Sequence, residues 1–179
     1  MKNLRLLPLI FALLFFTGCD LIDKIKGLET FEIAAALNGE YPVHVSETDP
    51  LSIDTTFDIS SKSHPDIAEY INDVQGYDLI TATLMITNWI EGDEDIVFNG
   101  SVTLGPVTEI VENLNPYTFY MDGNAYYLSL DSDDLQQINE DFNADDKISV
   151  RVNGTVSDKP IHFIIKLTLD LNVEVETDV

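Results

Sequence analysis

The segment IHFIIKLTLDLNVEVE, residues 161–176, decides the fold class of this chain. Apolar residues occupy every second position, and polar or charged residues fill nearly all the positions between them. Successive side chains of a β-strand point to opposite faces, so the segment is predicted to be a strand with one buried and one wet face. That pattern is typical of antiparallel sheets. The predicted inward-facing residues are Ile161, Phe163, Ile165, Leu167, Leu169, Leu171, Val173 and Val175.

The same alternation marks further strands upstream of this segment. We predict strands at residues 31–37, 51–57, 77–90, 96–104 and 148–156, with turns at Asn38-Gly39 and at 158–160. Pro106 is predicted to end the strand before it or to lie at a sheet edge. Residues 117–128 give the clearest hairpin prediction, because Asp122-Gly123 supplies the two left-handed residues that a tight turn requires.

Two short helices are predicted between the strands. Ser63 is expected to cap the first, with Pro65 in its first turn, and Ser132 is expected to cap the second. About eight strands and two short helices predict a mainly β fold, an antiparallel β-sandwich that forms one domain over residues 29–179. A β-barrel is the alternative, because a period of two does not reveal how a sheet closes.

The amino-terminal residues are typical of an export signal. Lys2 and Arg5 are followed by the uncharged stretch 6–18, which is rich in Leu, Ile and Phe, is interrupted by Pro8, and is too short for a stable membrane span. The segment ends in Thr17-Gly18-Cys19, the only Cys of the chain. It resembles the lipobox of bacterial lipoproteins, in which a small residue precedes a Cys that is lipidated and becomes the first mature residue.

That resemblance implies a signal peptide at residues 1–18, a lipid on Cys19 and a membrane-anchored chain in the bacterial cell envelope. Fatty chains contribute about 0.8 kcal/mol of membrane affinity per buried CH2 group, so a multiply acylated Cys anchors a protein durably. Residues 20–28 carry apolar side chains at helical spacing, and with Cys19 they are predicted to form a short tether, 19–28. The side of the membrane on which the protein lies stays open.

The mature chain is strongly acidic. Lys2 and Arg5 are the only charged residues in 1–18, so seven of the nine basic residues remain against 32 acidic ones, a formal charge of −25. A surface of this charge repels nucleic acid, which we therefore exclude as a partner. The charge suits either simple solubility or attraction to divalent cations or to a basic protein.

The sequence contains no recognisable catalytic motif. We therefore expect that the protein is not an enzyme. The three histidines, His44, His64 and His162, lie in separate segments without the close spacing of a zinc motif. The chain has no nucleophile elbow and no glycine-rich phosphate loop. No resident cofactor is predicted beyond the calcium ion considered next.

An acidic segment provides the candidate metal site. Asp141, Asn143 and Asp145 resemble the first half of an EF-hand calcium loop, with oxygen-bearing side chains at its first, third and fifth positions. The pattern then departs from an EF-hand, because Asp146 and Val152 stand where the loop has Gly and a bidentate Glu. A looser calcium site and a solvated acidic turn are the two interpretations, and both also apply to residues 91–95.

Aromatic residues provide the candidate ligand site. The predicted hairpin places Tyr120 and Tyr127 on one face, and Trp89, the only Trp, ends a strand near the acidic residues 91–95. Aromatic rings on both faces of a hairpin favour a stacking platform for a sugar ring or a peptide. Cross-strand aromatic pairs also stabilise ordinary sheets, so core packing is the alternative interpretation.

The sequence therefore predicts a lipid-anchored envelope protein with a binding or structural role. Three specific functions remain open at this point. They are a carbohydrate- or peptide-binding module that uses Tyr120, Tyr127 and Trp89, a calcium-stabilised adhesion protein, and an acidic inhibitor of a basic wall-degrading enzyme.

Overall fold

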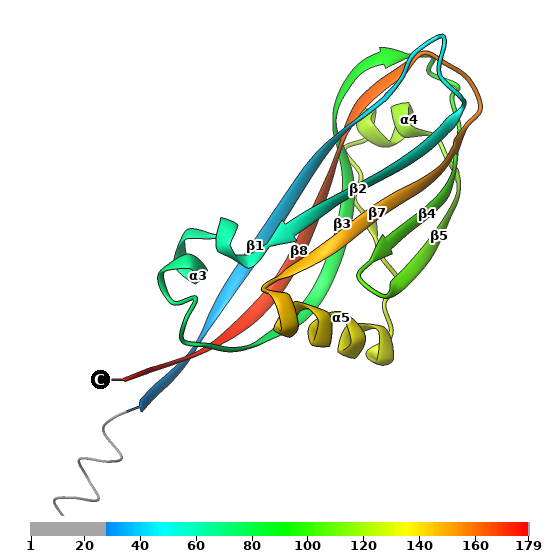
Figure 1. Ribbon diagram of the computed structural model, residues 1–179. Coiled ribbons are helices and arrows are strands. Elements are labelled where there is room, and N and C mark those ends of the chain that lie inside the picture. Colours follow the sequence, from blue (N-terminus) through cyan, green and yellow to red (C-terminus); the bar gives the residue numbers. More distant parts are fainter. Residues whose placement is uncertain (1–27, 179) are drawn as a thin grey trace, which may run out of the picture.

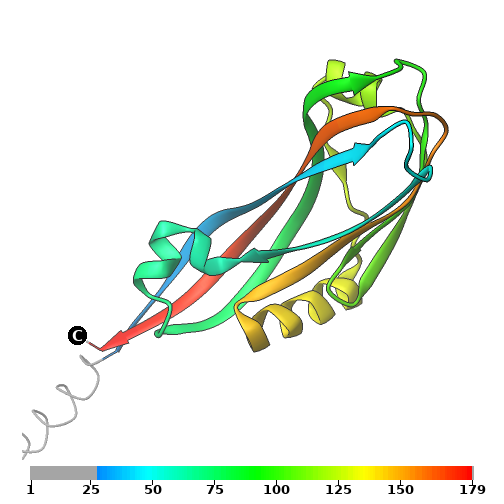
Figure 2. The same ribbon diagram turned by 45° about the horizontal axis from the view of Figure 1, so that its top comes forward.

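The computed structural model describes residues 28–178 of the chain, which form two antiparallel sheets of four strands each. One sheet has the strand order β1-β8-β3-β6, and the other has the order β2-β7-β4-β5. The strands of both layers run along the long axis of the molecule (Figure 1, Figure 2). The predicted sandwich is confirmed, and the alternative of one closed sheet is not formed. The predicted signal peptide and Cys19 lie outside the described residues, as does nearly all of the tether.

The first sheet is formed by β1 (Leu28–Val45), β8 (Ile161–Asp178), β3 (Val74–Gly92) and the short β6 (Tyr126–Tyr127). The second sheet is formed by β2 (Ser52–Ser60), β7 (Lys147–Val156), β4 (Phe98–Leu104) and β5 (Val107–Leu114). The helices are the 3-10 turn η1 (Ser61–Ser63), α3 (Pro65–Glu69), α4 (Pro116–Met121) and α5 (Ser132–Asp145).

Strand β8 lies in the middle of the first sheet, and its alternation is confirmed. All eight residues predicted to point inward, from Ile161 to Val175, are at most 5% exposed. They pack against the inward side chains of the second sheet, such as Val150 and Val152 of β7 and Val102 of β4. Burial of a side chain of this size stabilises a fold by about 1.5–3 kcal/mol. The intersheet layer is therefore the core that holds the domain together.

The predicted turn at Asn38-Gly39 is wrong, because β1 continues through both residues. Asn38 pairs with Thr168 of β8, and Gly39 pairs with Leu167. A Cβ atom on Gly39 would lie 2.7 Å from Ile59 Cγ1, far inside normal contact. Gly39 is therefore needed for the close approach of β2, and its lack of a side chain serves packing rather than a turn.

The predicted hairpin at 117–128 is also wrong. Asn115 caps a helix there, since its side-chain oxygen accepts the N–H of Thr118 at 2.8 Å, and Pro116 stands in the first turn. Asp122 ends helix α4, and Gly123 follows with a positive φ of 62°. The Asn-Pro start and the Gly stop therefore outweigh the β preference of the aromatic residues.

The strand that the sequence pattern missed is β5. Its burial does not alternate cleanly, because only Val111 of its eight residues is fully buried. Gly105, with a positive φ of 56°, and Pro106 form the turn from β4 into β5. Pro106 thus follows the end of a strand, as predicted. The number of strands agrees with the prediction because β5 replaces the missing first arm of the hairpin.

The two predicted helices exist with different caps. The first is shorter than expected, and its cap is His64 rather than Ser63, with no side-chain hydrogen bond. The second begins one residue after Asp131, which forms a reciprocal capping box with Asp134, so that Ser132 is its first residue. An Asp side chain accepts the free N–H groups at a helix start as well as Ser does, which explains the shift by one residue.

Candidate functional site

The two ends of the sandwich differ in what they present. The beginning of β1 and the end of β8 lie together at one end, which we call the proximal end (Figure 1). The loops 46–51, 93–97 and 157–160 lie together at the opposite end, close to α4 (Figure 1). We call these three loops the distal loops. They are the segments that lie farthest from the start of the described chain.

Hydrogen bonds hold the distal loops together. Ser157 N donates to Val97 O, and Val97 N donates to Ser157 Oγ, both at 2.9 Å. Lys159 Nζ donates to the backbone oxygen of Asp49 at 2.6 Å. The side chain of Asn115, at the start of α4, donates to the backbone oxygen of Glu94 at 2.8 Å. The three loops and the start of α4 therefore form one connected surface.

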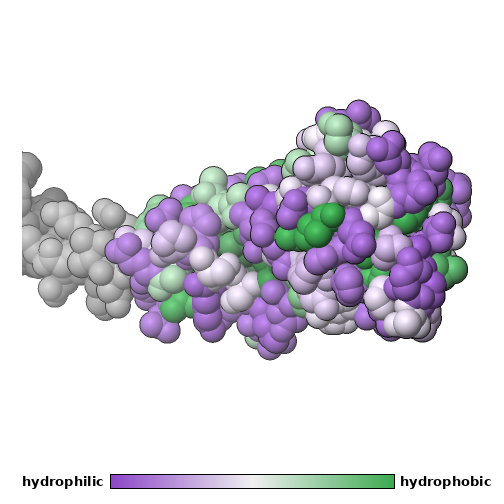
Figure 3. All heavy atoms as spheres, turned by 90° about the horizontal axis from the view of Figure 1, so that it is seen from above, coloured by the Kyte–Doolittle hydropathy of each residue, from purple (hydrophilic) through white to green (hydrophobic). Residues whose placement is uncertain are grey.

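This surface is acidic. Six exposed carboxylates stand on the distal loops against one basic side chain, Lys159, and they belong to Glu47, Asp49, Asp93, Glu94, Asp95 and Asp158. Hydrogen bonds from Ser46 lower the pKa of Asp49. On the face shown in Figure 3, hydrophilic residues predominate and apolar residues form separate patches.

Three basic side chains elsewhere in the described residues do little to balance this charge, because each is already paired with a carboxylate. Lys62 lies 3.3 Å from Asp146, Lys147 lies 2.7 Å from Asp58, and Arg151 lies 2.8 Å from Asp54. Hydrogen bonds from Arg151 and from Lys147 lower the pKa values of Asp54 and Asp58, respectively. The acidic surplus therefore stays on the distal loops and on other exposed positions.

The predicted aromatic platform is not assembled as expected. Trp89 of β3 stacks on Phe163, with ring centres 5.9 Å apart, and meets Tyr117 of α4 edge-on at 5.5 Å. Tyr120 is half-buried on α4 and packs against the core, whereas Tyr127 is 66% exposed on β6. Among the described residues, no ring contact joins Trp89, Tyr120 and Tyr127. The loss of the hairpin explains this, because Tyr120 lies on α4 and Tyr127 lies on β6, instead of both lying on one face of a hairpin.

Tyr117 couples this aromatic cluster to the distal loops. The neighbouring Glu94 carboxylate raises the pKa of the Tyr117 phenol. Trp89, Phe163 and Tyr117 therefore support α4 and the loop 93–97 from beneath. Sequence reasoning missed Tyr117 as a contact of Trp89, because a helix was not predicted at that position.

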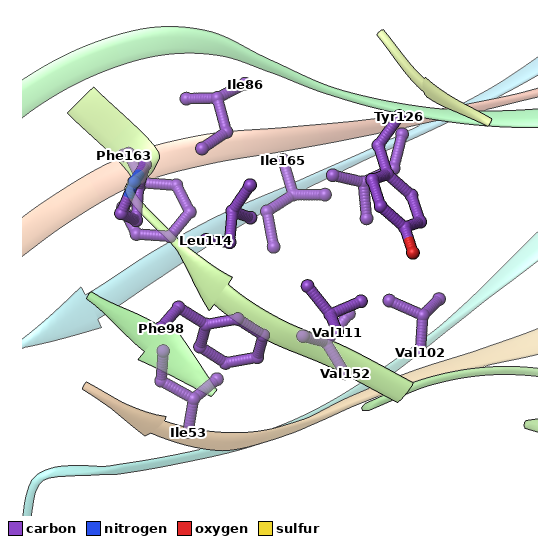
Figure 4. Close-up of a pocket in the computed structure, with 12 residues that line it drawn as sticks. Ile53, Ile86, Phe98, Val102, Val111, Leu114, Tyr126, Val152, Phe163 and Ile165 are labelled. Atoms are coloured by element: carbon purple, nitrogen blue, oxygen red, sulfur yellow. The ribbon is translucent and has the colours of Figure 1, made fainter. Parts of the chain in front are cut away.

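A cavity lies between the sheets beneath α4 (Figure 4). Its volume is about 20 Å³, and apolar side chains such as Phe98, Val152 and Ile165 line it. Tyr126 brings a polar atom close to it, and its hydroxyl donates to Glu109 Oε1 at 2.9 Å. Burial, together with that carboxylate, raises the pKa of Tyr126. A space of this size holds a single small group, and its apolar lining gives water no partners, so it is a packing gap rather than a ligand pocket.

The predicted calcium loop is a helix instead. Asp141, Asn143 and Asp145 lie on the last turns of α5, and Asp146 ends the helix with a left-handed φ of 55°. The side-chain oxygen of Asn143 accepts the backbone N–H of Tyr77 at 2.9 Å. Across residues 28–178, no three His, Cys, Asp or Glu side chains are placed to hold a metal ion together. The loop geometry on which the EF-hand comparison depended is therefore wrong.

Helix α5 instead closes an open sheet edge. Asn139 accepts the N–H of Leu79 at 2.8 Å, one turn before the Asn143 contact with Tyr77. Two amide oxygens at i and i+4 thus replace the strand that would otherwise pair with the first half of β3. Covering an edge in this way prevents pairing with other chains.

Two histidines that are distant in the sequence lie next to each other in the structure. His44 of β1 and His162 of β8 are directly opposite each other in the sheet, and their ring centres are 4.9 Å apart. Only the β1–β8 register shows this pairing, because 117 positions separate the two residues in the chain. The third histidine, His64, lies far from them, at the start of α3.

Comparisons with known proteins identify no family for this chain. No protein-family model matches it, and neither does any curated protein. Among solved structures, it is similar to the crystal structure of the infectious bursal disease virus VP2 subviral particle, with 9% identity and a TM-score of 0.27. The match covers 85% of this chain and 37% of the viral chain. In the described part of the chain, the helices are all too short or too polar to span a membrane.

Proposed function

We propose that the chain is a lipid-anchored, non-enzymatic binding protein of the bacterial cell envelope, and that its distal loops recognise a basic protein. The observation that carries this proposal is the position of the acidic loops at the end opposite the start of β1. A chain anchored through Cys19 has its tether leading into β1 at Leu28, so the distal loops are the part that reaches farthest from the membrane.

Charge complementarity supports a basic partner over the other classes. Six carboxylates against one amine give the distal loops a negative field, which speeds the encounter with a positive surface. The hydrogen bonds between the loops support a surface that is formed before the partner arrives, which lowers the entropy lost on binding. The sugar- or peptide-binding alternative loses its main support, because the aromatic platform on which it depended is not assembled.

The test compares two variants that remove equal charge from opposite ends. The distal variant combines Asp93→Asn, Glu94→Gln and Asp95→Asn, which keep the shape of the loop. The control variant combines Glu32→Gln, Asp78→Asn and Glu174→Gln at the proximal end, where the register places these residues on adjacent strands. Lysozyme, a basic wall-degrading enzyme, serves as the probe, and the full-length lipidated chain is held in detergent.

We expect the distal variant to bind lysozyme about tenfold more weakly, since three exposed ionic contacts contribute about 0.5 kcal/mol each. The control variant should bind nearly as tightly as the natural chain, and added salt should weaken all three. Equal losses in the two variants would show attraction to net charge alone and would contradict recognition by the distal loops. Absence of binding by the natural chain at low salt would count against a basic wall-degrading enzyme as the partner.

A further inference from the structure

His44 and His162 are two imidazoles from distant segments that face each other across strands β1 and β8. The two residues are cross-strand partners, so their side chains leave the sheet on the same side. Their sequence neighbours Val43, Val45 and Phe163 are buried, which puts both imidazoles on the outer face of the first sheet. His44 is exposed and His162 is half-buried, so an ion from solvent can reach both.

The distance between the rings fits one shared ion. A metal–nitrogen bond of about 2.0–2.1 Å places the centre of each imidazole about 3 Å from the ion, and two imidazoles at a tetrahedral angle then have centres about 5 Å apart. The observed separation is 4.9 Å, with the ring planes at 76° to each other. Rotation of each ring about its metal–nitrogen bond leaves this separation unchanged, so the angle between the planes does not conflict with shared ligation.

The charges around the pair favour a cation. Glu91 of β3 is the residue opposite His162 on the other side of β8. The Asp49 carboxylate lies close enough to His44 for that histidine to act on it electrostatically. Lys159 is the basic group nearby, and its amine is bound to the backbone oxygen of Asp49. The surrounding field is therefore negative and raises the local concentration of cations.

We propose that His44 and His162 together bind one divalent first-row transition-metal ion, with water completing its coordination. Imidazole nitrogen suits copper, nickel and zinc, and the ordinary order of affinities predicts that Cu²⁺ binds more tightly than Ni²⁺ or Zn²⁺. Two protein ligands give weaker binding than the three or four of an enzyme or a structural zinc site.

The chain provides its own control for this proposal. It has three histidines, and His64 lies on another element, so His64→Gln removes an imidazole without touching the pair. The experiment titrates CuCl2, and then ZnCl2, into the full-length chain in detergent by calorimetry. Cys19→Ser is present throughout to remove the only thiol, and no histidine tag is used. The variants are His44→Gln, His162→Gln and His64→Gln.

We expect one Cu²⁺ ion per chain, with binding at least about tenfold weaker after either His44→Gln or His162→Gln and unchanged after His64→Gln. Histidine NMR signals of the unaltered pair should broaden together when Cu²⁺ is added, while those of His64 stay sharp, and this readout does not depend on a variant. No binding, or equal weakening by His64→Gln, would overturn the proposal. Full affinity after loss of either member of the pair would overturn it as well. Metal binding is measured on the chain alone, so its outcome is separate from that of the basic partner.

Discussion

The substitution Gly154→Ala tests the contact between β4 and β7 at a single atom. Gly154 pairs with Gly100 across the two strands, and the ring of Phe98 covers both. A Cβ atom at 154 would lie 2.5 Å from the backbone oxygen of Asn99, 2.6 Å from Phe98 Cε2 and 2.7 Å from Gly100 Cα. Two of these three atoms belong to the neighbouring backbone, so moving one side chain does not relieve the clash.

The expected loss of stability follows from these distances. Comfortable contact begins near 3.4 Å, so β4 and β7 must separate by about 0.9 Å, which strains the hydrogen bonds between them. Overpacking of a core costs about 1–3 kcal/mol, and a clash with backbone belongs at the upper end of that range. A gain of about 0.5 kcal/mol from restricting the unfolded chain offsets part of this cost. We expect a net loss of about 2–3 kcal/mol, or about 5–10 °C in Tm.

Urea unfolding measures this loss, with the fluorescence of Trp89, the only Trp, and circular dichroism as independent probes. Gly76→Ala is the matched control, because the closest atom to its added Cβ is Asn143 Oδ1 at an ordinary 3.7 Å. The control should change the free energy of unfolding by less than about 0.5 kcal/mol. If Gly154→Ala is as stable as Gly76→Ala, the pairing of Gly154 with Gly100 under Phe98 is wrong.

Three further predictions concern the β3 edge, a buried tyrosine and the anchor. Asn143→Ala should lower the free energy of unfolding by about 1 kcal/mol, because the Asn143 side chain accepts a hydrogen bond from the edge of β3. The loss should be equal with calcium and with a chelator. A loss seen only with calcium would restore the metal interpretation. Burial raises the pKa of Tyr77 to about 12, so the stability contributed by its neutral phenol is complete below pH 10 and is lost as the pH rises from 10 toward 12. Tyr77→Phe, which leaves Ser61 and Asp146 without the phenol that lies 2.9 Å from each, should cost about 1–2 kcal/mol at neutral pH. In urea titrations, that difference should shrink at high pH, and a constant difference would contradict the raised pKa. Radioactive palmitate should label the natural chain in producing cells and not Cys19→Ser, and equal labelling would contradict the anchor.

The strands that the sequence predicted best are those with one face on the core and the other face in water. β8 and β7 follow the period of two over their whole lengths, because one face of each lies on the core and the other meets water. β5 was missed for the opposite reason. It is an edge strand, where a residue such as Ile110 is exposed and Glu109 bonds to Tyr126, so its burial does not alternate.

The predictions of the hairpin and of the Asn38-Gly39 turn were wrong because a glycine is compatible with more than one local structure. Asp122-Gly123 fits a tight turn, yet Gly123 also fits the residue after a helix, and the upstream Asn115-Pro116 decided between the two. At Gly39, the need for a glycine comes from Ile59 on another strand. A contact of that kind is visible only after the sheets have been stacked.

The candidate sites depended on the same tertiary information. Asp141, Asn143 and Asp145 have the oxygens of a calcium loop, but the capping box at Asp131 starts a helix that runs through all of them. The pairing of His44 with His162 depends on a register that no local pattern encodes. What the sequence did provide is the large negative charge, and the fold determines which carboxylates gather at the distal loops.

Photo-crosslinking in intact producing cells tests recognition by the distal loops most directly. A photo-reactive amino acid replaces Asp95 in the distal loops or Asp66 on α3 near the proximal end, both of which are exposed. Mass spectrometry then identifies the attached protein. We predict a basic protein attached through position 95, absent at position 66, and lost when Asp93→Asn and Glu94→Gln are added. Equal attachment at both positions, or an acidic protein at position 95, would contradict the proposed function.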